Sequence, residues 1–352
     1  MLIPRRPAFL LAIVLVLAGC QVSRTPAPTS TRQLQVASVT RIVVQPALSP
    51  VAFSPDGEKI AFSTNRGIRV ADLSGAFREI ARARGATAIS WSPRLGLIAY
   101  IEAGAVWSMR PDGRQRVRLS LPGVAGDLSW ARGGDKLAVV LRRSVEGATR
   151  FELWITSRDG GFRRMLTRAP IGRAIRDPQW FNDSLFLLFG VSAPGRDALE
   201  RATRIRIAYP DRREVPIDTP AVSLRLAPYG ERVAYVTGPA LEDDRGRVVI
   251  SRLNGTGRVT VTSKDGRYTG LAWSPQGDKL AYAELINDAE AEIWVVDADG
   301  SGRLRVFSYA LELPDPSVAL STTWSPDGLK LIFGTNTGAF TGPLWLATLE
   351  RR

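Results

Sequence analysis

A short phrase that opens on a large apolar residue, followed in its full form by a Ser-Pro turn and glycine, recurs seven times with variation and restricts the fold more than any other feature. Its fullest forms are Trp273-Ser-Pro-Gln-Gly277 and Trp324-Ser-Pro-Asp-Gly328. The anchors that open the phrase lie between 38 and 51 residues apart, at Phe53, Trp91, Trp130, Trp180, Leu226, Trp273 and Trp324. This period suits one four-stranded blade of a β-propeller. The phrase therefore predicts a repeat architecture.

The repeat at residues 269–308 shows how one blade is built. Four β-type runs, at 269–273, 279–283, 292–297 and 304–308, are separated by turn residues. The Ser-Pro-x-Gly phrase suits a tight turn, because Pro presets φ and Gly tolerates the last position. Asp299-Gly300 is a strong hairpin sequence. We therefore expect short antiparallel strands in the order of the chain.

The last repeat lacks a fourth strand, since only 320–324, 330–334 and 344–348 have strand character. A strand-like run at 39–45 precedes the first repeat, and we expect it to pair with the third strand of the seventh repeat. Such pairing closes the ring and removes two exposed sheet edges. The predicted fold is all-β, a seven-bladed propeller of four-stranded antiparallel blades. Six blades are the alternative, because the fourth and fifth repeats are degraded.

The N-terminus carries a second pattern. Arg5 and Arg6 precede an apolar run that ends in Leu17-Ala18-Gly19-Cys20, too short and wrongly flanked for a membrane-spanning helix. The run resembles a bacterial lipoprotein signal, and Cys20 is the sole cysteine of the chain. An ordinary secretory signal with an incidental cysteine is the alternative. We expect a signal peptide at 1–19, a lipidated Cys20 with a Pro/Ser/Thr-rich tether over 20–38, and the propeller at 39–352.

The repeat resembles the TolB-type, WD-like β-propeller family. The resemblance rests on Trp-Ser-Pro-x-Gly followed by Lys279-Leu-Ala-Tyr282 and Ile293-Trp-Val-Val-Asp-Ala-Asp-Gly300, and it covers about residues 39–350. It implies a disc with a central channel whose loops bind proteins, and TolB itself is a periplasmic partner of an envelope-maintenance complex. The chain departs from TolB in its seven repeats and its lipid signal. The resemblance therefore implies an envelope location more strongly than a TolB role.

Conventional catalytic residue sets are absent from the sequence. The chain has no histidine, which removes Ser-His-Asp and Cys-His nucleophiles and every His-ligated metal site. The densest carboxylate groups are 242–244 and Asp288, Glu290 and Glu292. We expect a non-enzymatic protein without metal or cofactor. The alternative is a carbohydrate- or peptide-processing enzyme that uses carboxylates at the propeller channel.

The expected binding surface consists of long insertions between the second and third strands of the blades. Loops between equivalent strands fall on one face of a propeller. The candidate partner-binding residues are Arg142, Arg143, Arg150, Arg196, Arg201, Arg204, Glu242, Asp243 and Asp244.

The predicted function is that of a membrane-anchored extracytoplasmic scaffold, a monomer that binds an envelope protein or peptide. Its net charge of +13 favours anionic partners, and export excludes nucleic acid. Gln21 after the cysteine favours the outer membrane if the host has two membranes. In a host with one membrane, we expect the outer face of the cytoplasmic membrane.

Overall fold

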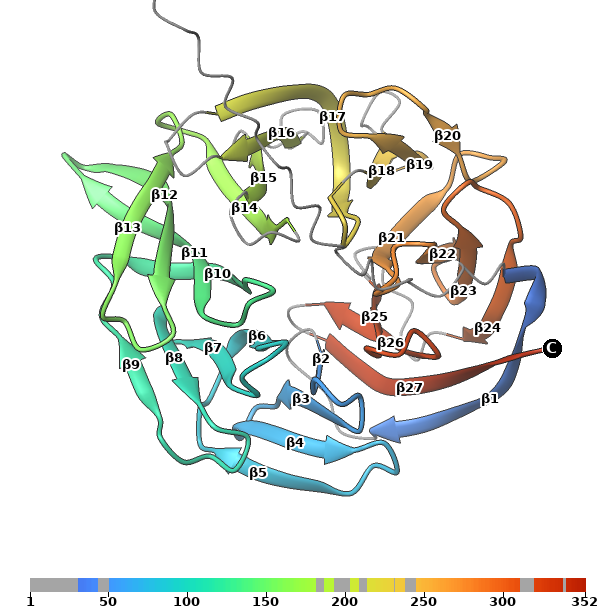
Figure 1. Cartoon of the computed structure of the whole chain (residues 1–352), viewed down its shortest axis with the longest axis horizontal. Coiled ribbons are helices and arrows are strands. Elements are labelled where there is room, and N and C mark those ends of the chain that lie inside the picture. The colour runs from blue at the N-terminus through green and yellow to red at the C-terminus, as the bar shows by residue number, and fades with distance from the viewer. Residues whose placement is uncertain are drawn as a thin grey trace, which may run out of the picture.

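The computed structural model describes residues 31–43, 51–181, 187–192, 203–208, 214–230, 232–237, 245–310, 320–337 and 340–352. Within these ranges the chain forms 27 strands and one 3-10 turn, η1 (Thr31–Gln33). None of the described segments is a helix long and apolar enough to cross a membrane. The sheets are arranged radially about a central axis, with the first strand of each repeat innermost (Figure 1). The all-β propeller prediction is confirmed.

Each of the first three repeats forms one four-stranded antiparallel sheet. Their strands are β2 (Ala52–Phe53), β3 (Lys59–Ser63), β4 (Ile68–Asp72) and β5 (Phe77–Ala81); β6 (Thr87–Trp91), β7 (Ile98–Glu102), β8 (Ala105–Met109) and β9 (Val117–Leu119); β10 (Val124–Trp130), β11 (Lys136–Val145), β12 (Ala148–Ser157) and β13 (Arg163–Arg168).

The fourth and fifth repeats share a single seven-stranded sheet. Its strands are β14 (Ala174–Trp180), β15 (Leu187–Ser192), β16 (Thr203–Ala208), β17 (Glu214–Leu226), β18 (Arg232–Thr237), β19 (Arg247–Arg252) and β20 (Val259–Thr260). The first part of β17 pairs with β16, and its last five residues pair with β18.

The described strands therefore form six sheets, and the prediction of seven separate blades is wrong. Six, the alternative, is the observed number, although the sheets contain seven sequence repeats. The reason lies in the connection between the fourth and fifth repeats. Four other connections between repeats contain a glycine, at Gly85, Gly123, Gly172 and Gly266, whereas β17 contains none and has four β-branched residues, so the strand continues from one repeat into the next.

The sixth and seventh repeats complete the ring. Their strands are β21 (Arg267–Trp273), β22 (Lys279–Asn287), β23 (Glu290–Asp297) and β24 (Leu304–Ala310); β25 (Leu320–Trp324), β26 (Lys330–Thr337), β27 (Phe340–Arg351) and the N-terminal β1 (Leu34–Val43). β1 pairs antiparallel with β27, from Leu34 opposite Arg351 to Val43 opposite Leu344. The predicted closure by an N-terminal strand is confirmed.

The closing strand begins earlier than the sequence suggested. β1 starts at Leu34, so residues 34–38 belong to the sheet and not to the predicted tether. Leu34 is 2% exposed and packs among residues of the sixth and seventh repeats. Apolar residues alternate with polar ones at Leu34 and Val36, and this short pattern gives the strand one buried face.

The recurring tryptophans link neighbouring repeats by hydrogen bonds. The indole Nε1 of four of the five tryptophan anchors donates to the backbone oxygen of the residue before the anchor of the preceding repeat, at distances of 3.0 to 3.2 Å, whereas the buried Nε1 of Trp91 has no partner among the described residues. The pairs are Trp130 with Ser90, Trp180 with Ser129, Trp273 with Arg225, and Trp324 with Ala272. Tryptophan suits this anchor because its indole supplies both a large apolar area and a hydrogen-bond donor.

The fifth repeat replaces the indole bond by another. Its anchor, Leu226, has no donor on its side chain. Gln179, on β14 of the preceding repeat, accepts a bond from the Leu226 N–H at 2.7 Å and donates Nε2 to the Leu224 oxygen at 3.0 Å. One side-chain amide thus fastens the degraded repeat to its neighbour.

The disc has two faces, which we call the turn face and the hairpin face. The turn face carries the connections between first and second and between third and fourth strands, such as residues 92–97 and 110–116. The hairpin face carries the connections between second and third strands, such as 146–147, and those between repeats, such as 169–173. The chain enters at the turn face, because the Thr31 N–H donates to the Asp297 carboxylate at 2.8 Å and its hydroxyl bonds the Gly302 oxygen in the β23–β24 turn.

Candidate functional site

The predicted insertion at 142–150 is a paired hairpin and not a loop. β11 and β12 stay in register from Lys136 opposite Ser157 to Val145 opposite Ala148. The turn is Glu146-Gly147, and both residues have positive φ, 53° and 77°. Two such residues make the two-residue turn that matches strand twist. The expectation of a loop is therefore wrong here, and the candidate arginines stand on a regular strand pair.

Two of these arginines lie opposite one another. Arg143 pairs with Arg150 in the register, and the pair two positions along, on the same face of the sheet, is Leu141 with Glu152. The Arg143 guanidinium donates to both oxygens of Glu152, at 3.2 and 3.4 Å. The Glu152 side chain is 5% exposed, and it also accepts the Trp154 indole N–H at 2.8 Å. Arg143 is thus held by a buried carboxylate, which the sequence analysis did not identify as part of the site.

The remaining predicted site residues are not brought together by the described structure. Arg204 lies on β16 opposite Val191, and only its backbone is described. Residues that fall outside the described ranges are Cys20, Arg196, Arg201, Glu242, Asp243 and Asp244. Of the other acidic group, Asp288 pairs with Arg267 at 2.9 Å and Glu292 with Arg305 at 3.0 Å. These carboxylates form local ion pairs.

A carboxylate pair lies on the inner strands of the third and fourth repeats. Asp127 on β10 and Asp177 on β14 both stand three residues before their tryptophan anchor. The Asp177 N–H donates to one Asp127 oxygen at 3.0 Å, and the Leu128 N–H donates to the other at 2.8 Å. Burial and the neighbouring Asp177 charge raise the pKa of Asp127 from 3.8 to about 6.

The backbone around this pair has an unusual conformation. Asp177 has φ of 49°, and the equivalent positions Ala88, Ser223 and Gly270 also lie in the left-handed region. Each marks a register shift between the first and second strands of its repeat. Such bulges aim side chains away from the regular pleat. The Arg225 guanidinium, from β17, lies 3.8 Å from the Asp177 carboxylate, so the inner strands of three successive repeats contribute charged groups here.

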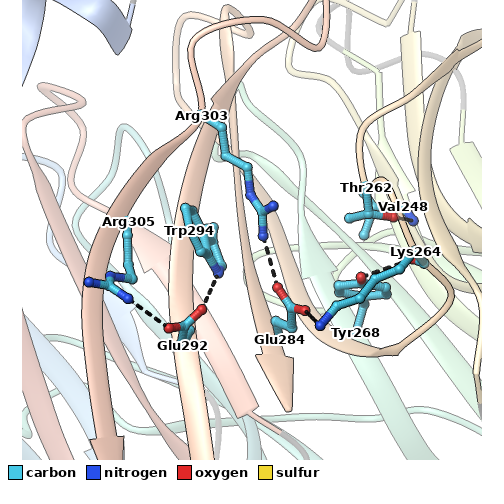
Figure 2. Close-up of polar contacts among 9 residues, drawn as sticks. All are labelled: Val248, Thr262, Lys264, Tyr268, Glu284, Glu292, Trp294, Arg303 and Arg305. Carbon is cyan, nitrogen blue, oxygen red and sulfur yellow. Dashed lines mark hydrogen bonds and ion pairs between the residues drawn. The ribbon is translucent and has the colours of Figure 1, made fainter. Parts of the chain in front are cut away.

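A second buried carboxylate, Glu284 on β22, organises the outer part of the sixth repeat. Figure 2 shows Glu284 between two cations, Arg303 at 2.8 Å and Lys264 at 3.1 Å. The Arg303 guanidinium stacks 3.6 Å from the ring centre of Trp294, whose indole N–H donates to Glu292 at 3.1 Å. Arg303 directly follows Gly302, where the N-terminal segment is bound. The cluster therefore holds the turn that receives Thr31.

The same arrangement occurs in the second repeat. Arg116 donates to the Tyr100 hydroxyl at 2.5 Å, bonds Glu102 and stacks 4.0 Å from the Trp107 ring centre. Its counterparts in the sixth repeat are Arg303, Tyr282, Glu284 and Trp294. In both repeats the arginine follows the tryptophan by nine residues. This spacing was available in the sequence, and the contacts show that the arginine ties the outermost part of its repeat to the second and third strands.

No metal-binding cluster of three or more His, Cys, Asp or Glu side chains occurs among the described residues. Two of the cavities between repeats are grooves on the turn face. One of about 570 Å³ is lined by Phe77, Arg78 and Arg110, and one of about 510 Å³ by Leu95, Arg158 and Phe162.

Comparison with known proteins identifies the fold. Oligogalacturonate lyase from Vibrio parahaemolyticus superposes with a TM-score of 0.65 at 12% identity, over 90% of this chain and 96% of the lyase. The β-propeller domain of the Trilobed protease from Pyrococcus furiosus gives 0.61 at 14% identity, over 87% of this chain and 97% of that domain. The chain has the fold of these β-propellers.

TolB from Acinetobacter baumannii gives a TM-score of 0.50 at 17% identity, over 75% of this chain. The match spans 63% of the TolB chain, so this chain covers less than two thirds of its length. The TolB-type resemblance is confirmed at the level of the fold. No family model and no curated protein matches the sequence.

Proposed function

We propose that this protein is a lipid-anchored, extracytoplasmic β-propeller that binds another protein of the cell envelope through its hairpin face. The observation that carries the proposal is the β11–β12 hairpin, which presents Arg142, Arg143 and Arg150 on a regular strand pair. The Cys20 signal supports the anchor, and the fold-level likeness to TolB supports an envelope role.

The hairpin is a preorganised surface. Arg143 is fixed by Glu152, whose burial leaves that carboxylate little freedom to move. Fixing a side chain before binding lowers the conformational entropy that the complex has to lose. Arg142 is exposed on the opposite side of the same hairpin, across from Phe151. The partner therefore meets a guanidinium on each side of a rigid strand pair.

The charge on the hairpin is only partly neutralised. Arg143 and Arg150 are cross-strand neighbours, and like charges in that position repel. One carboxylate, Glu152, serves this pair, and the buried Nε of Arg150 has no hydrogen-bond partner within the described structure. A carboxylate from a partner would neutralise the uncompensated charge of this arginine pair. The hairpin thus fits an acidic protein segment.

The attachment of the chain at Thr31 supports this choice of surface. Thr31 is bound on the turn face, so the hairpin face is directed away from the attachment point. A partner that approaches the hairpin face does not have to pass between the disc and the membrane.

The test is cross-linking in intact cells followed by purification and mass spectrometry. We compare the parent chain with Arg142→Glu and Arg150→Glu together, and with Arg258→Glu, an exposed arginine on the turn face, as the matched control. The proposal expects one envelope protein that is lost at least tenfold in the double variant and retained in the control. Equal recovery from all three chains refutes the hairpin as the binding surface.

A second candidate, acid catalysis by Asp127, is favoured by one observation, its raised pKa beside a second carboxylate. A protonated carboxyl at mildly acidic pH can serve as a general acid, as in glycoside hydrolysis. Arg225 near Asp177 makes the surroundings polar, unlike the apolar pocket expected of such a pair. Turnover of acidic oligosaccharides that disappears in Asp127→Asn would establish this function, and absence of turnover in the parent chain would remove it.

A further inference from the structure

The turn face carries two equivalent exposed phenylalanines. Phe77 and Phe162 are each 51% exposed. They occupy the same place in Gly75-Ala-Phe-Arg78 of the first repeat and Gly160-Gly-Phe-Arg163 of the third. In both, the glycine closes the β-turn with positive φ, 94° at Gly75 and 76° at Gly160. The turn therefore projects an aromatic ring and an arginine together at two sites on one face.

Each ring borders a groove that also contains cations. The groove beside Phe77 is lined by Arg78, Arg110 and Lys59. The groove beside Phe162 is lined by Arg158, Lys136 and Leu95, the last 42% exposed. The guanidinium of buried Arg69 lies 4.3 Å from the Phe77 ring centre and holds that ring in place. Both grooves thus combine an apolar edge with cationic side chains.

Four carboxylates also line the two grooves, one fewer than the five cations, and the bonds that they accept within the turns leave them charged: Asp72, Asp112, Asp135 and Asp159. Asp112 accepts the Arg114 N–H, and Asp159 accepts the Gly161 N–H and the Ser157 hydroxyl. These bonds lower the pKa of both aspartates. Further exposed cations on this face are Arg94, Arg114, Arg163 and Arg164. Charge complementarity therefore favours an anionic partner.

We infer that the turn face lies on an anionic phospholipid membrane, with Phe77 and Phe162 at the level of the headgroups and the surrounding arginines on lipid phosphates. The N-terminal segment, thirty residues before Thr31, joins the disc on this face, so an anchor in it keeps this face next to the bilayer. Aromatic and basic residues together are typical of membrane-surface contacts. The inference rests on the proposed function only for the presence of a nearby membrane.

The hairpin face supplies matched controls. Ile171 and Ile286 are 62% and 43% exposed, and they lie on a connection between repeats and at the end of β22. Replacing them removes a comparable exposed apolar area from the face that is directed away from the anchor.

The experiment uses the unacylated chain from Gln21 onward, because the ring closes within residues 31–352. It is sedimented with vesicles of phosphatidylglycerol and phosphatidylcholine in equal parts, and with phosphatidylcholine alone. We expect binding to the anionic vesicles that weakens between 50 and 500 mM salt, as for exposed charges. Phe77→Ser with Phe162→Ser should weaken it by at least about tenfold, and Arg110→Glu by at least about fivefold. Ile171→Ser with Ile286→Ser should leave it unchanged.

Absence of binding to anionic vesicles overturns the inference, and so does equal binding by the phenylalanine variant. Binding that persists in phosphatidylcholine alone and at high salt also overturns it, since the contact would not depend on lipid charge. Circular dichroism checks that each variant is folded. The arginine variants of the β11–β12 hairpin are tested for partner capture in cells, so failure of the proposed function and failure of the membrane contact are separate results.

Discussion

Asp127 should make the fold less stable as pH rises, in contrast to the other aspartates with shifted pKa values. Its pKa is raised from 3.8 to about 6, so the folded chain retains a proton between these values that the unfolded chain has released. Stability therefore falls as pH rises through this window. The aspartates of the turns, such as Asp56 and Asp72, have lowered pKa values. They therefore change the stability of the fold only below about pH 4. The interval between pH 4.5 and 7.5 isolates Asp127.

The magnitude follows from the displacement of the pKa. At about 1.36 kcal/mol per pKa unit, the change from 3.8 to about 6 corresponds to about 3 kcal/mol. Asp127 is partly exposed, and solvent screening reduces the expected effect to about 1 to 2 kcal/mol. We expect Asp127→Asn to remove this part of the pH dependence. Asp177→Asn should reduce it by removing the neighbouring charge, and Asn tolerates the positive φ at that position.

The assay is urea unfolding followed by tryptophan fluorescence at pH 4.5, 6.0 and 7.5. The quantity to compare is the slope of the unfolding free energy against pH. Asn at 127 loses one of the two oxygen acceptors, which lowers stability equally at every pH and does not change that slope. If the parent and Asp127→Asn curves run parallel over this interval, the raised pKa does not exist in the folded protein. If the stability of the parent chain rises with pH over this interval, Asp127 does not retain a proton in the folded protein.

Three further predictions concern the ring itself. Deleting residues 34–43 should abolish cooperative unfolding, and Leu34→Ala should cost about 2 to 4 kcal/mol because a buried side chain at the closing seam is lost; both are measured by thermal unfolding. Gln179→Ala should cost about 1 to 3 kcal/mol by leaving the Leu226 N–H unpaired, whereas the Leu224 oxygen keeps its bond from Arg225; Gln276→Ala, an exposed amide on the turn face, is the control. Glu284→Gln should destabilise by about 2 kcal/mol in urea, since Arg303 and Lys264 then face each other uncompensated, and equal stability would show that solvent screens them.

Much of the fold could be predicted because its determinants are local. The Ser-Pro-x-Gly phrase is a turn at residues 54–57, 274–277 and 325–328, closed in each by a bond from the glycine N–H to the serine oxygen. The unusual connection between the fourth and fifth repeats was harder to predict. Nothing in a single strand such as β17 shows that it ends one sheet and begins the next, because both partners are set by distant residues.

The candidate site was only partly predictable for the same reason. Glu146-Gly147 was a hairpin sequence within the supposed loop, and recognising it would have extended β11 and β12. Asp127 and Asp177 lie 50 residues apart, and neither is conspicuous alone. Aligning the repeats on their anchors would have placed both at the same position. The contact with Arg225 depends on how three inner strands converge, which the sequence pattern does not specify.

The binding of Thr31 to the sixth repeat has a mechanical consequence for a tethered disc. Any pull transmitted through residues before Thr31 first reaches Asp297 and Gly302, ahead of the first β1–β27 pair at Leu34 and Arg351. The force therefore enters the sheet of β21 to β24, whose strands follow one another in the sequence. The β1–β27 pairing, which joins the two ends of the chain, does not bear it first. The Thr31 bonds therefore bear a pulling force before it reaches the β1–β27 pairing that closes the ring.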